Sequence, residues 1–191
     1  MERKNYKERL KNITTFIFDV DGVFTNTQVF VNNDGDLLRS MNMKDGFAVK
    51  TAIAKGYTIC IITGGGNVGV QKRFENLGVK DIFMLRHQKL ETFLKYQKEK
   101  HLKREQILYM GDDMPDIPPM KRAGLAICPV DAVPEVRAVS DYISHLEGGQ
   151  GAVRDIIEQV LKVRGDWTFE DKESHFTYYI KGCLPCGRQP L

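Results

Sequence analysis

Two aspartates separated by one residue follow an apolar run near the start of the chain. Asp19 and Asp21 lie in segment 16–23, whose first part has the composition of a buried strand. In an extended strand, residues two apart point to the same side, so we expect both carboxylates to converge at the strand's end. Two carboxylates in a partly dry site repel unless one keeps a proton or a cation lies between them. The pair predicts metal-dependent chemistry, although an Asp-Gly turn that caps the next element gives the same pattern.

Carboxylates also follow a later apolar run. Segment 107–110 is succeeded by Asp112 and Asp113, with Asp116 close behind. Ligands of parallel α/β sheets gather beyond the carboxyl ends of the strands, so these side chains are expected beside the first pair. Burying them without compensation would cost on the order of several kcal/mol for each charge. Carboxylates and waters suit Mg²⁺, which we therefore expect as the cofactor.

The remaining chemistry-bearing residues are complementary to an anion. Thr63 and Gly64 come directly after the apolar run 57–62, and Lys89 follows the next strand-like segment. A hydroxyl and free backbone N–H groups at a helix start would cradle a phosphate, and the lysine would add positive charge. A metal, an anion cradle, a lysine and a carboxylate nucleophile together predict phosphoryl transfer.

Alternating strands and helices must position these residues. The first expected strand begins at Phe16 and stops on Asp19 and Asp21. The later expected strands are 27–31, 37–43, 57–62, 81–85, 107–110, 125–128 and 142–143, and the expected helices are 45–55, 68–77, 89–101, 118–123 and 152–163. Short connections between alternating elements predict an α/β fold, a parallel sheet with helices on both faces. The strands within 27–43 are expected to form a hairpin through 32–35, whose Asn, Asp and Gly residues suit a tight turn. We expect one domain at 1–167 and a tail at 168–191.

Composition limits the function classes. The chain has 191 residues and a formal net charge of +3, with no basic field that would indicate nucleic acid. Apolar runs are too short to span a bilayer, and the charged segment 1–12 does not resemble a secretory signal, so we expect a cytoplasmic protein. Of four cysteines, Cys60 and Cys128 are expected to be buried hydrophobes. Cys183 and Cys186 form a CxxC in the tail without further metal ligands nearby, so no chemical role is expected. The histidines are expected on the surface.

The ordered motifs resemble those of the haloacid dehalogenase superfamily of phosphatases. They are Asp19-Val20-Asp21-Gly22, Thr63-Gly64, Lys89 and Gly111-Asp112-Asp113-Met114-Pro115-Asp116. The resemblance implies a Rossmann-like three-layer sandwich in which Asp19 is the nucleophile that forms an aspartyl-phosphate. It also implies that Asp21 is the general acid and base, while Thr63 and Lys89 hold the phosphoryl group. Mg²⁺ would be bound by Asp19, the backbone carbonyl of Asp21 and Asp112, with support from Asp113 and Asp116.

Further motifs resemble the capless phosphatases of 3-deoxy-D-manno-octulosonate 8-phosphate, which act in lipopolysaccharide precursor synthesis. They are the hairpin without a cap domain, Asn42-Met43-Lys44-Asp45-Gly46-Phe47, Arg73 and the segment 148–154. The resemblance covers about 13–167. It implies that Asn42, Met43, Lys44, Asp45, Gly46, Lys50, Gly64 and Arg73 contact a sugar acid phosphate together with Asp21 and Lys89. It also implies a homotetramer in which a neighbouring subunit completes the active site.

Two departures from that family bear on the substrate. Its members commonly carry Arg where this chain has Gly65, and often Arg where it has Gln150. Because a forked guanidinium binds a carboxylate well, a phosphatase of a nine-carbon sugar acid 9-phosphate (2-keto-3-deoxynononate or acylneuraminate) remains an alternative.

Two other function classes stay open. Segment 64–69 fits the pattern GxGxxG of dinucleotide-binding oxidoreductases, but Asp81 opens the next strand, where the pattern expects an acid at its end. A non-catalytic sugar-phosphate-binding subunit is the other alternative. Intact Asp19 and Asp21 argue against it, because binding alone needs no nucleophile.

Overall fold

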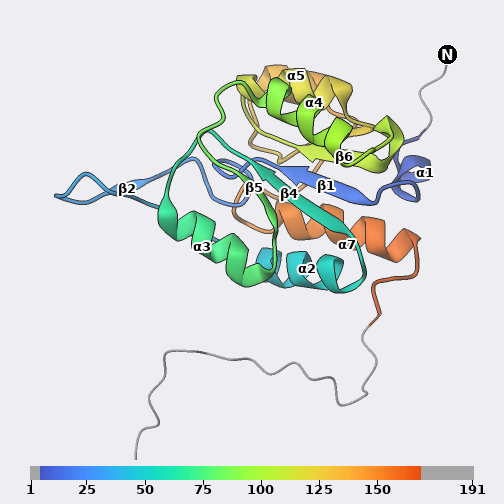
Figure 1. Ribbon diagram of the computed structural model, residues 1–191, viewed down its shortest axis with the longest axis horizontal. Helices are drawn as coiled ribbons and strands as arrows, with labels where there is room; N and C mark the ends of the chain where they lie inside the picture. Colours follow the sequence, from blue (N-terminus) through green and yellow to red (C-terminus); the bar gives the residue numbers. More distant parts are fainter. Residues whose placement is uncertain (1–4, 169–191) are drawn as a thin grey trace, which may run out of the picture.

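Six parallel strands form the centre of the computed structural model, which describes residues 5–168 (Figure 1). The strands are β1 (Thr15–Phe18), β4 (Thr58–Ile62), β5 (Asp81–Phe83), β6 (Ile107–Met110), β7 (Leu125–Cys128) and β8 (Tyr142–Ile143), in the order β5-β4-β1-β6-β7-β8. Phe18 pairs in register with Ile61 of β4 and Met110 of β6. The carboxyl ends of these three strands therefore lie side by side, with β1 in the middle.

Helices cover both faces of the sheet, as the alternating pattern predicted. They are α1 (Tyr6–Leu10), α2 (Met43–Ala54), α3 (Val68–Leu77), α4 (Lys89–Glu99), α5 (Ile117–Arg122), α6 (Pro134–Val139) and α7 (Ala152–Val163), with short 3₁₀ turns η1 (Arg104–Gln106) and η2 (Met114–Asp116). Figure 1 shows α2, α3 and α7 on one face and α4 and α5 on the other. Local signals set the helix ends: Asn42 and Asn67 cap α2 and α3, and Gly78 ends α3 with a φ of 91°.

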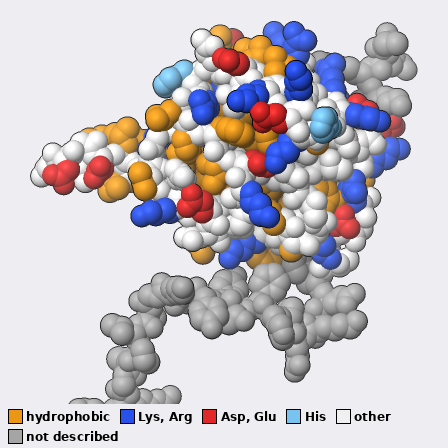
Figure 2. Space-filling model, in the orientation of Figure 1, with side chains coloured by type: hydrophobic (Ala, Val, Ile, Leu, Met, Phe, Trp, Pro, Cys, Tyr) orange, Lys and Arg blue, Asp and Glu red, His pale blue; other side chains and the backbone are white. Residues whose placement is uncertain are grey.

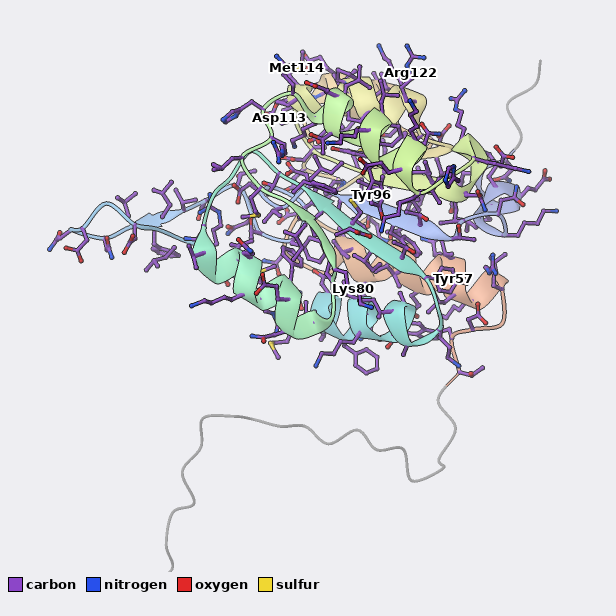
Figure 3. All side chains as sticks on the ribbon, viewed as in Figure 1. Tyr57, Lys80, Tyr96, Asp113, Met114 and Arg122 are labelled. Atoms are coloured by element: carbon purple, nitrogen blue, oxygen red, sulfur yellow. The ribbon has the colours of Figure 1, made fainter. Side chains whose placement is uncertain are left out.

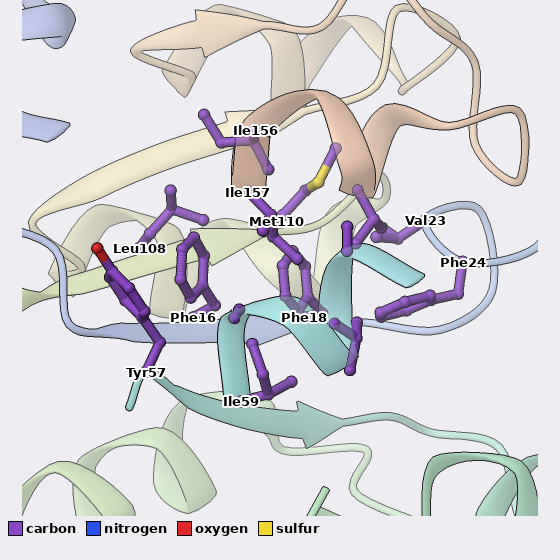
Figure 4. Close-up of a cluster of buried hydrophobic side chains, with 14 of the residues drawn as sticks. Phe16, Phe18, Val23, Phe24, Tyr57, Ile59, Leu108, Met110, Ile156 and Ile157 are labelled. Carbon is purple, nitrogen blue, oxygen red and sulfur yellow. The ribbon is translucent and has the colours of Figure 1, made fainter. Parts of the chain in front are cut away.

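The core consists of two apolar clusters, one on each side of the sheet. All four residues of β1 are buried, and successive side chains enter opposite clusters. Phe16 and Phe18 pack beside Leu108 and Met110 of β6 and below the α7 residues (Figure 4). Burial of each such side chain contributes roughly 1.5–3 kcal/mol. The strand that carries the first aspartates is thereby fixed from both faces.

The hairpin projects from one end of the sheet, at the left of Figure 1. Its paired parts are β2 (Phe30–Val31) and β3 (Leu37–Leu38), with Phe30 opposite Leu38. These strands are shorter than the expected 27–31 and 37–43, and Met43, the last residue of the second expected strand, already belongs to α2. Figure 2 shows apolar side chains along this projection and acidic ones near its tip. The exposed apolar residues are Val29, Phe30, Val31, Leu37 and Leu38.

Several expectations lie beyond or beside the described elements. Helices α1 and α6 were not predicted, because elements of five and six residues are too short to show a periodic pattern. The predicted tail from 169 onward, including Cys183 and Cys186, lies outside the described residues. Cys60 and Cys128 are buried, as expected. Within 5–168, no helix has the length and apolar character that a bilayer crossing requires.

Candidate active site

The loops after β1, β4, β5 and β6 line one pocket at the carboxyl edge of the sheet. Its lining residues are Asp19, Asp21, Thr27, Thr63, Gly64, Gly65, Arg86, His87, Lys89, Asp112, Asp113 and Pro115. The structure thus brings together the strand-end residues that the sequence singled out. Asp113, beside Met114 at the start of η2, is labelled in Figure 3.

Asp19 is buried next to a lysine. Lys89 Nζ, at the start of α4, lies 2.7 Å from Asp19 Oδ2 and 2.8 Å from Asp116 Oδ1. Burial raises the pKa of Asp19 to about 7, because desolvation and the charge of Asp116 outweigh the attraction of Lys89. Burial lowers the pKa of Lys89, but the two carboxylates outweigh this effect and the net shift is upward. The lysine stabilises negative charge where a nucleophilic carboxylate is needed.

Asp116 has a positioning role in the described structure. Its Oδ1 accepts hydrogen bonds from Lys89 and from the Tyr109 hydroxyl at 2.8 Å. Its Oδ2 accepts from the backbone N–H groups of Asp112 and Asp113 at 3.3 and 3.5 Å. Because both oxygens are already engaged, Asp116 is better suited to orienting Lys89 and the loop after β6 than to binding a metal directly.

The remaining carboxylates fit a divalent cation. One oxygen from each of Asp19, Asp112 and Asp116 lies within 4.8 Å of the others. Asp19 Oδ1 and Asp112 Oδ1 are buried and have no hydrogen-bond partner among the described residues. The pKa of Asp112 rises to about 8 through burial and the charges of Asp19 and Asp116. A Mg²⁺ ion would satisfy the two open oxygens and remove the repulsion, so the residues present fit this metal.

Gly22 permits the close approach of Asp112. It has a φ of 79°, and a Cβ at this position would collide with the Asp112 carboxylate. The Asp-Gly turn that the sequence left open as a merely structural motif therefore also shapes the acidic cluster.

Asp21 is placed differently from the sequence expectation. β1 ends at Phe18, so Asp19 and Asp21 belong to the following turn, and the strand-alternation argument is wrong although both residues line the pocket. The Asp21 side chain is 40% exposed and binds Arg39, whose Nε and Nη2 lie 2.6 and 2.9 Å from its oxygens. Thr25 Oγ1 donates a third bond at 3.3 Å. The partly open position suits a group that exchanges protons with substrate and water.

The loop after β4 also differs in detail from the expected anion cradle. The cradle argument placed Thr63 and Gly64 at a helix start, but α3 begins at Val68, as predicted, so a loop separates the two residues from the helix. The N–H of Gly65 donates to Thr63 Oγ1 at 3.1 Å, and the N–H of Thr63 donates to Phe83 O at 3.0 Å. The buried Thr63 hydroxyl is thus oriented by the loop itself and keeps its own proton for a ligand.

Sequence reasoning missed three residues near the reacting groups: Arg39, Arg86 and His87. Arg86 and His87 line the pocket, and His87 is exposed there, as the histidines were predicted to be. The pattern contained a weak signal for Arg86 and His87, since they immediately precede Lys89 in the same loop.

The predicted substrate contacts around α2 lie apart from the residues that line this pocket. Asn42 caps α2 and donates to Gly149 O at 3.3 Å, while Arg73 lies 3.5 Å from Met43 Sδ. Lys44 and Lys50 are exposed on α2, and Gly46 is packed against Arg73.

Asp45 corrects the sequence prediction. Its side chain is completely buried, and its Oδ1 accepts the backbone N–H of Arg154 in the first turn of α7 at 2.8 Å. A carboxylate in this position caps α7 and cannot contact a substrate in solution.

Comparisons with known proteins agree with the site's chemistry. The family described as haloacid dehalogenase-like hydrolase matches residues 74–157. The 3-deoxy-D-manno-octulosonate 8-phosphate phosphatase of Salmonella typhi is 32% identical over 157 residues, which cover 82% of this chain and 84% of that protein. The enzyme of the same name from Escherichia coli strain K12 is 31% identical with the same coverage.

Solved structures of phosphatases from the same family are also similar to this chain. The Yersinia pestis phosphatase of that name has a TM-score of 0.83 and 29% identity, over 85% of this chain and 88% of that one. A Moraxella catarrhalis phosphatase, solved with magnesium, phosphate and the sugar acid KDO, has a TM-score of 0.81 and 31% identity, over 84% of this chain and 93% of that one.

Proposed function

Since this chain belongs to the family of 3-deoxy-D-manno-octulosonate 8-phosphate phosphatases, within the haloacid dehalogenase-like hydrolases, we propose that its strand-end residues hydrolyse that ester with Mg²⁺. The chain is a phosphoric monoester hydrolase, and the family does not favour the dinucleotide-binding or non-catalytic alternatives. The observation that carries the assignment of residues is the buried Asp19, paired through one oxygen with Lys89 and open at the other.

The reaction would proceed through two transfers at phosphorus. Asp19 attacks the phosphorus atom, the bond to the sugar oxygen breaks with its electron pair on that oxygen, and the Asp21 carboxyl supplies the proton. Asp21, now a carboxylate, then takes a proton from water while the water oxygen attacks phosphorus. The bond to Asp19 breaks, which returns its carboxylate and releases inorganic phosphate.

The other pocket residues bind and orient the phosphoryl group. Lys89 and the Thr63 hydroxyl would contact its oxygens, with Gly64 leaving room between them. Asp19, Asp112 and the backbone carbonyl of Asp21 would hold Mg²⁺, which supplies positive charge against the phosphate. Asp113 and Asp116 would support this arrangement from the loop after β6.

The sugar acid would extend from the pocket toward α2. Asn42, Met43, Lys44, Gly46, Lys50 and Arg73 are our proposed contacts for it. Lys44 and Arg73 are the candidates to bind its carboxylate, because Gly65 and Gln150 carry no charge. The exposed apolar hairpin supports a homotetramer in which a neighbouring subunit completes this part of the site, and we place the enzyme in the cytoplasm.

Phosphate release from the eight-carbon 8-phosphate and a nine-carbon 9-phosphate ester, measured side by side with Mg²⁺, tests this function. We expect preference for the eight-carbon ester and loss of activity by roughly 10³-fold or more in Asp19→Asn, which lacks the nucleophile. Preference for the nine-carbon ester would mean that a nine-carbon sugar acid 9-phosphate, and not the eight-carbon ester, is the substrate. Unchanged turnover in Asp19→Asn would refute the mechanism.

A further inference from the structure

The guanidinium of Arg39 donates two hydrogen bonds to the Asp21 carboxylate. Nε lies 2.6 Å from Asp21 Oδ1 and Nη2 lies 2.9 Å from Oδ2. The Arg39 side chain is only 9% exposed, whereas the Asp21 side chain is 40% exposed. Two parallel charge-assisted hydrogen bonds fix both the position and the plane of a carboxylate.

Arg39 is itself held in place by the base of the hairpin. Its Nη1 donates to the carbonyl oxygen of Leu37 at 2.9 Å. The same oxygen accepts a hydrogen bond from Asn67, the residue that caps α3, at 3.0 Å. The guanidinium therefore uses all three of its nitrogen atoms, two on Asp21 and one on a backbone that α3 anchors.

Gly65 leaves the space that this ion pair occupies. A Cβ at Gly65 would lie 3.5 Å from Asp21 Oδ2 and 3.7 Å from Arg39 Nη2. Both are ordinary van der Waals distances, so residue 65 lies directly against the ion pair of Asp21 and Arg39.

We propose that Arg39 is a positioning residue that holds the Asp21 carboxyl group in the position and plane from which it serves as the base for hydrolysis of the aspartyl-phosphate. This inference rests on the proposed phosphatase function and adds a residue that the family motifs did not indicate. Arg39 acts through Asp21 and need not touch the substrate.

The choice of ester separates the two halves of the reaction. Nitrophenolate departs without needing a proton, so with p-nitrophenyl phosphate the first half does not depend on how Asp21 is oriented. Attack by water depends on this orientation with every ester, because Asp21 must then accept a proton from that water. With p-nitrophenyl phosphate, removal of Arg39 should therefore slow the second half of the reaction and leave the first half close to its normal rate.

Rapid-quench kinetics of Arg39→Met with p-nitrophenyl phosphate and the sugar acid phosphate test this inference. We expect kcat to fall by roughly 10- to 100-fold, within the usual range for general-base effects. With p-nitrophenyl phosphate, KM should fall in parallel, so that kcat/KM stays within about threefold, because that ratio reports only the steps through transfer to Asp19. A burst of nitrophenolate stoichiometric with enzyme should appear, with an acyl phosphate that hydroxylamine traps. With the sugar acid phosphate, whose departing oxygen takes its proton from Asp21, kcat/KM should fall together with kcat.

Two further variants control for structural effects. Arg39→Lys keeps the charge without the fork and should restore part of kcat with a smaller burst. Arg122→Ala removes an exposed arginine at the end of α5, labelled in Figure 3, and should behave as wild type. Thermal melting establishes that each variant is folded.

Three outcomes would overturn the inference. If kcat/KM for p-nitrophenyl phosphate falls together with kcat and no burst forms, Arg39 serves the first half or only the fold. If KM rises for the sugar acid ester alone, Arg39 is a substrate ligand. If Arg39→Met matches wild type, the ion pair has no kinetic role. Wild-type enzyme that releases phosphate from neither ester would instead refute the proposed function itself.

Discussion

Lys89 contacts two of the three carboxylates that form the acidic cluster, which explains how this cluster tolerates burial. Asp19 and Asp116 share its ammonium group, whereas Asp112 has no such partner among the described residues and shows the larger upward pKa shift of the two open carboxylates. One lysine cannot neutralise three acids. This excess of negative over positive charge in the acidic cluster is the physical reason to expect a divalent cation there.

The buried Asp45 gives a prediction at the residue scale. Burial raises its pKa from 3.8 to about 6, and Oδ2 has no hydrogen-bond partner among the described residues. The folded state therefore binds a proton more tightly than the unfolded state. This contribution to stability is complete below about pH 4 and is lost as the pH rises through 6, by roughly 3 kcal/mol at most.

Asp45→Asn should remove this pH dependence. It retains an oxygen for the Arg154 N–H, so we expect the variant to gain stability relative to wild type between pH 4 and 7, with the difference constant above that range. Thermal unfolding in saturating Mg²⁺ measures the effect. Asp34→Asn, in the exposed hairpin turn, is the matched control. Parallel curves for wild type and Asp45→Asn would contradict this account.

Residues of the site could be predicted from the sequence pattern where they directly follow an apolar run. Asp19, Thr63 and Asp112 each follow a buried strand, and parallel strands bring their ends together. Arg39 lies 18 residues beyond Asp21, after a hairpin, and no spacing rule connects the two. Asp45 was misassigned because its motif suggested a ligand while helix packing made it a cap.

At the scale of elements, predictions succeeded where one face of an element is continuously buried. Strands β6 and β7 and helices α3 and α7 have the expected bounds, since their apolar pattern matches their burial. β8 also has the expected bounds, although its two residues are not buried. The hairpin strands were predicted too long, because an exposed hairpin has no buried face to fix its register within the chain. The segment between β3 and α2 was predicted as part of the second strand. It is not a strand, and its Arg39 side chain contacts Asp21.

The hairpin also gives a prediction about assembly. Phe30 and Val31 are 71% and 66% exposed on two short strands, an arrangement that is marginal by itself. If these residues are buried between copies of this chain, Phe30→Glu should place a charge in that interface and shift the protein to smaller species. Size-exclusion chromatography with light scattering measures the change.

A matched substitution distinguishes the hairpin from general surface effects. Leu94→Glu alters an apolar residue of α4 that is 45% exposed and should leave the oligomer intact. A wild-type protein that is monomeric at micromolar concentration would contradict the proposed assembly, as would an unchanged oligomer in Phe30→Glu.

At the scale of the whole molecule, metal binding and folding stability are linked because the acidic cluster lies between both cores. β1 and β6 contribute to each apolar cluster, and their carboxyl ends carry Asp19 and Asp112. Mg²⁺ at 100 times its Kd would stabilise the folded state by about 2.7 kcal/mol. For a chain of this size we expect the Tm to rise by roughly 5–10 °C. Differential scanning calorimetry with Mg²⁺ and with EDTA measures this rise.

Asp112→Asn and pH together test whether the acidic cluster causes that response. The pKa values of Asp19 and Asp112, about 7 and about 8, exceed the ordinary value of 3.8, so the metal-free protein should lose stability as the pH rises from 5 to 8. Because Mg²⁺ needs ionised ligands, its effect on the Tm should be larger at pH 8 than at pH 5.

Asp112→Asn removes one repelling charge, so in EDTA its Tm at pH 8 should equal or exceed that of wild type, while the response to Mg²⁺ disappears. If the variant still gains stability from Mg²⁺, the ion binds elsewhere and the buried carboxylates are not its ligands.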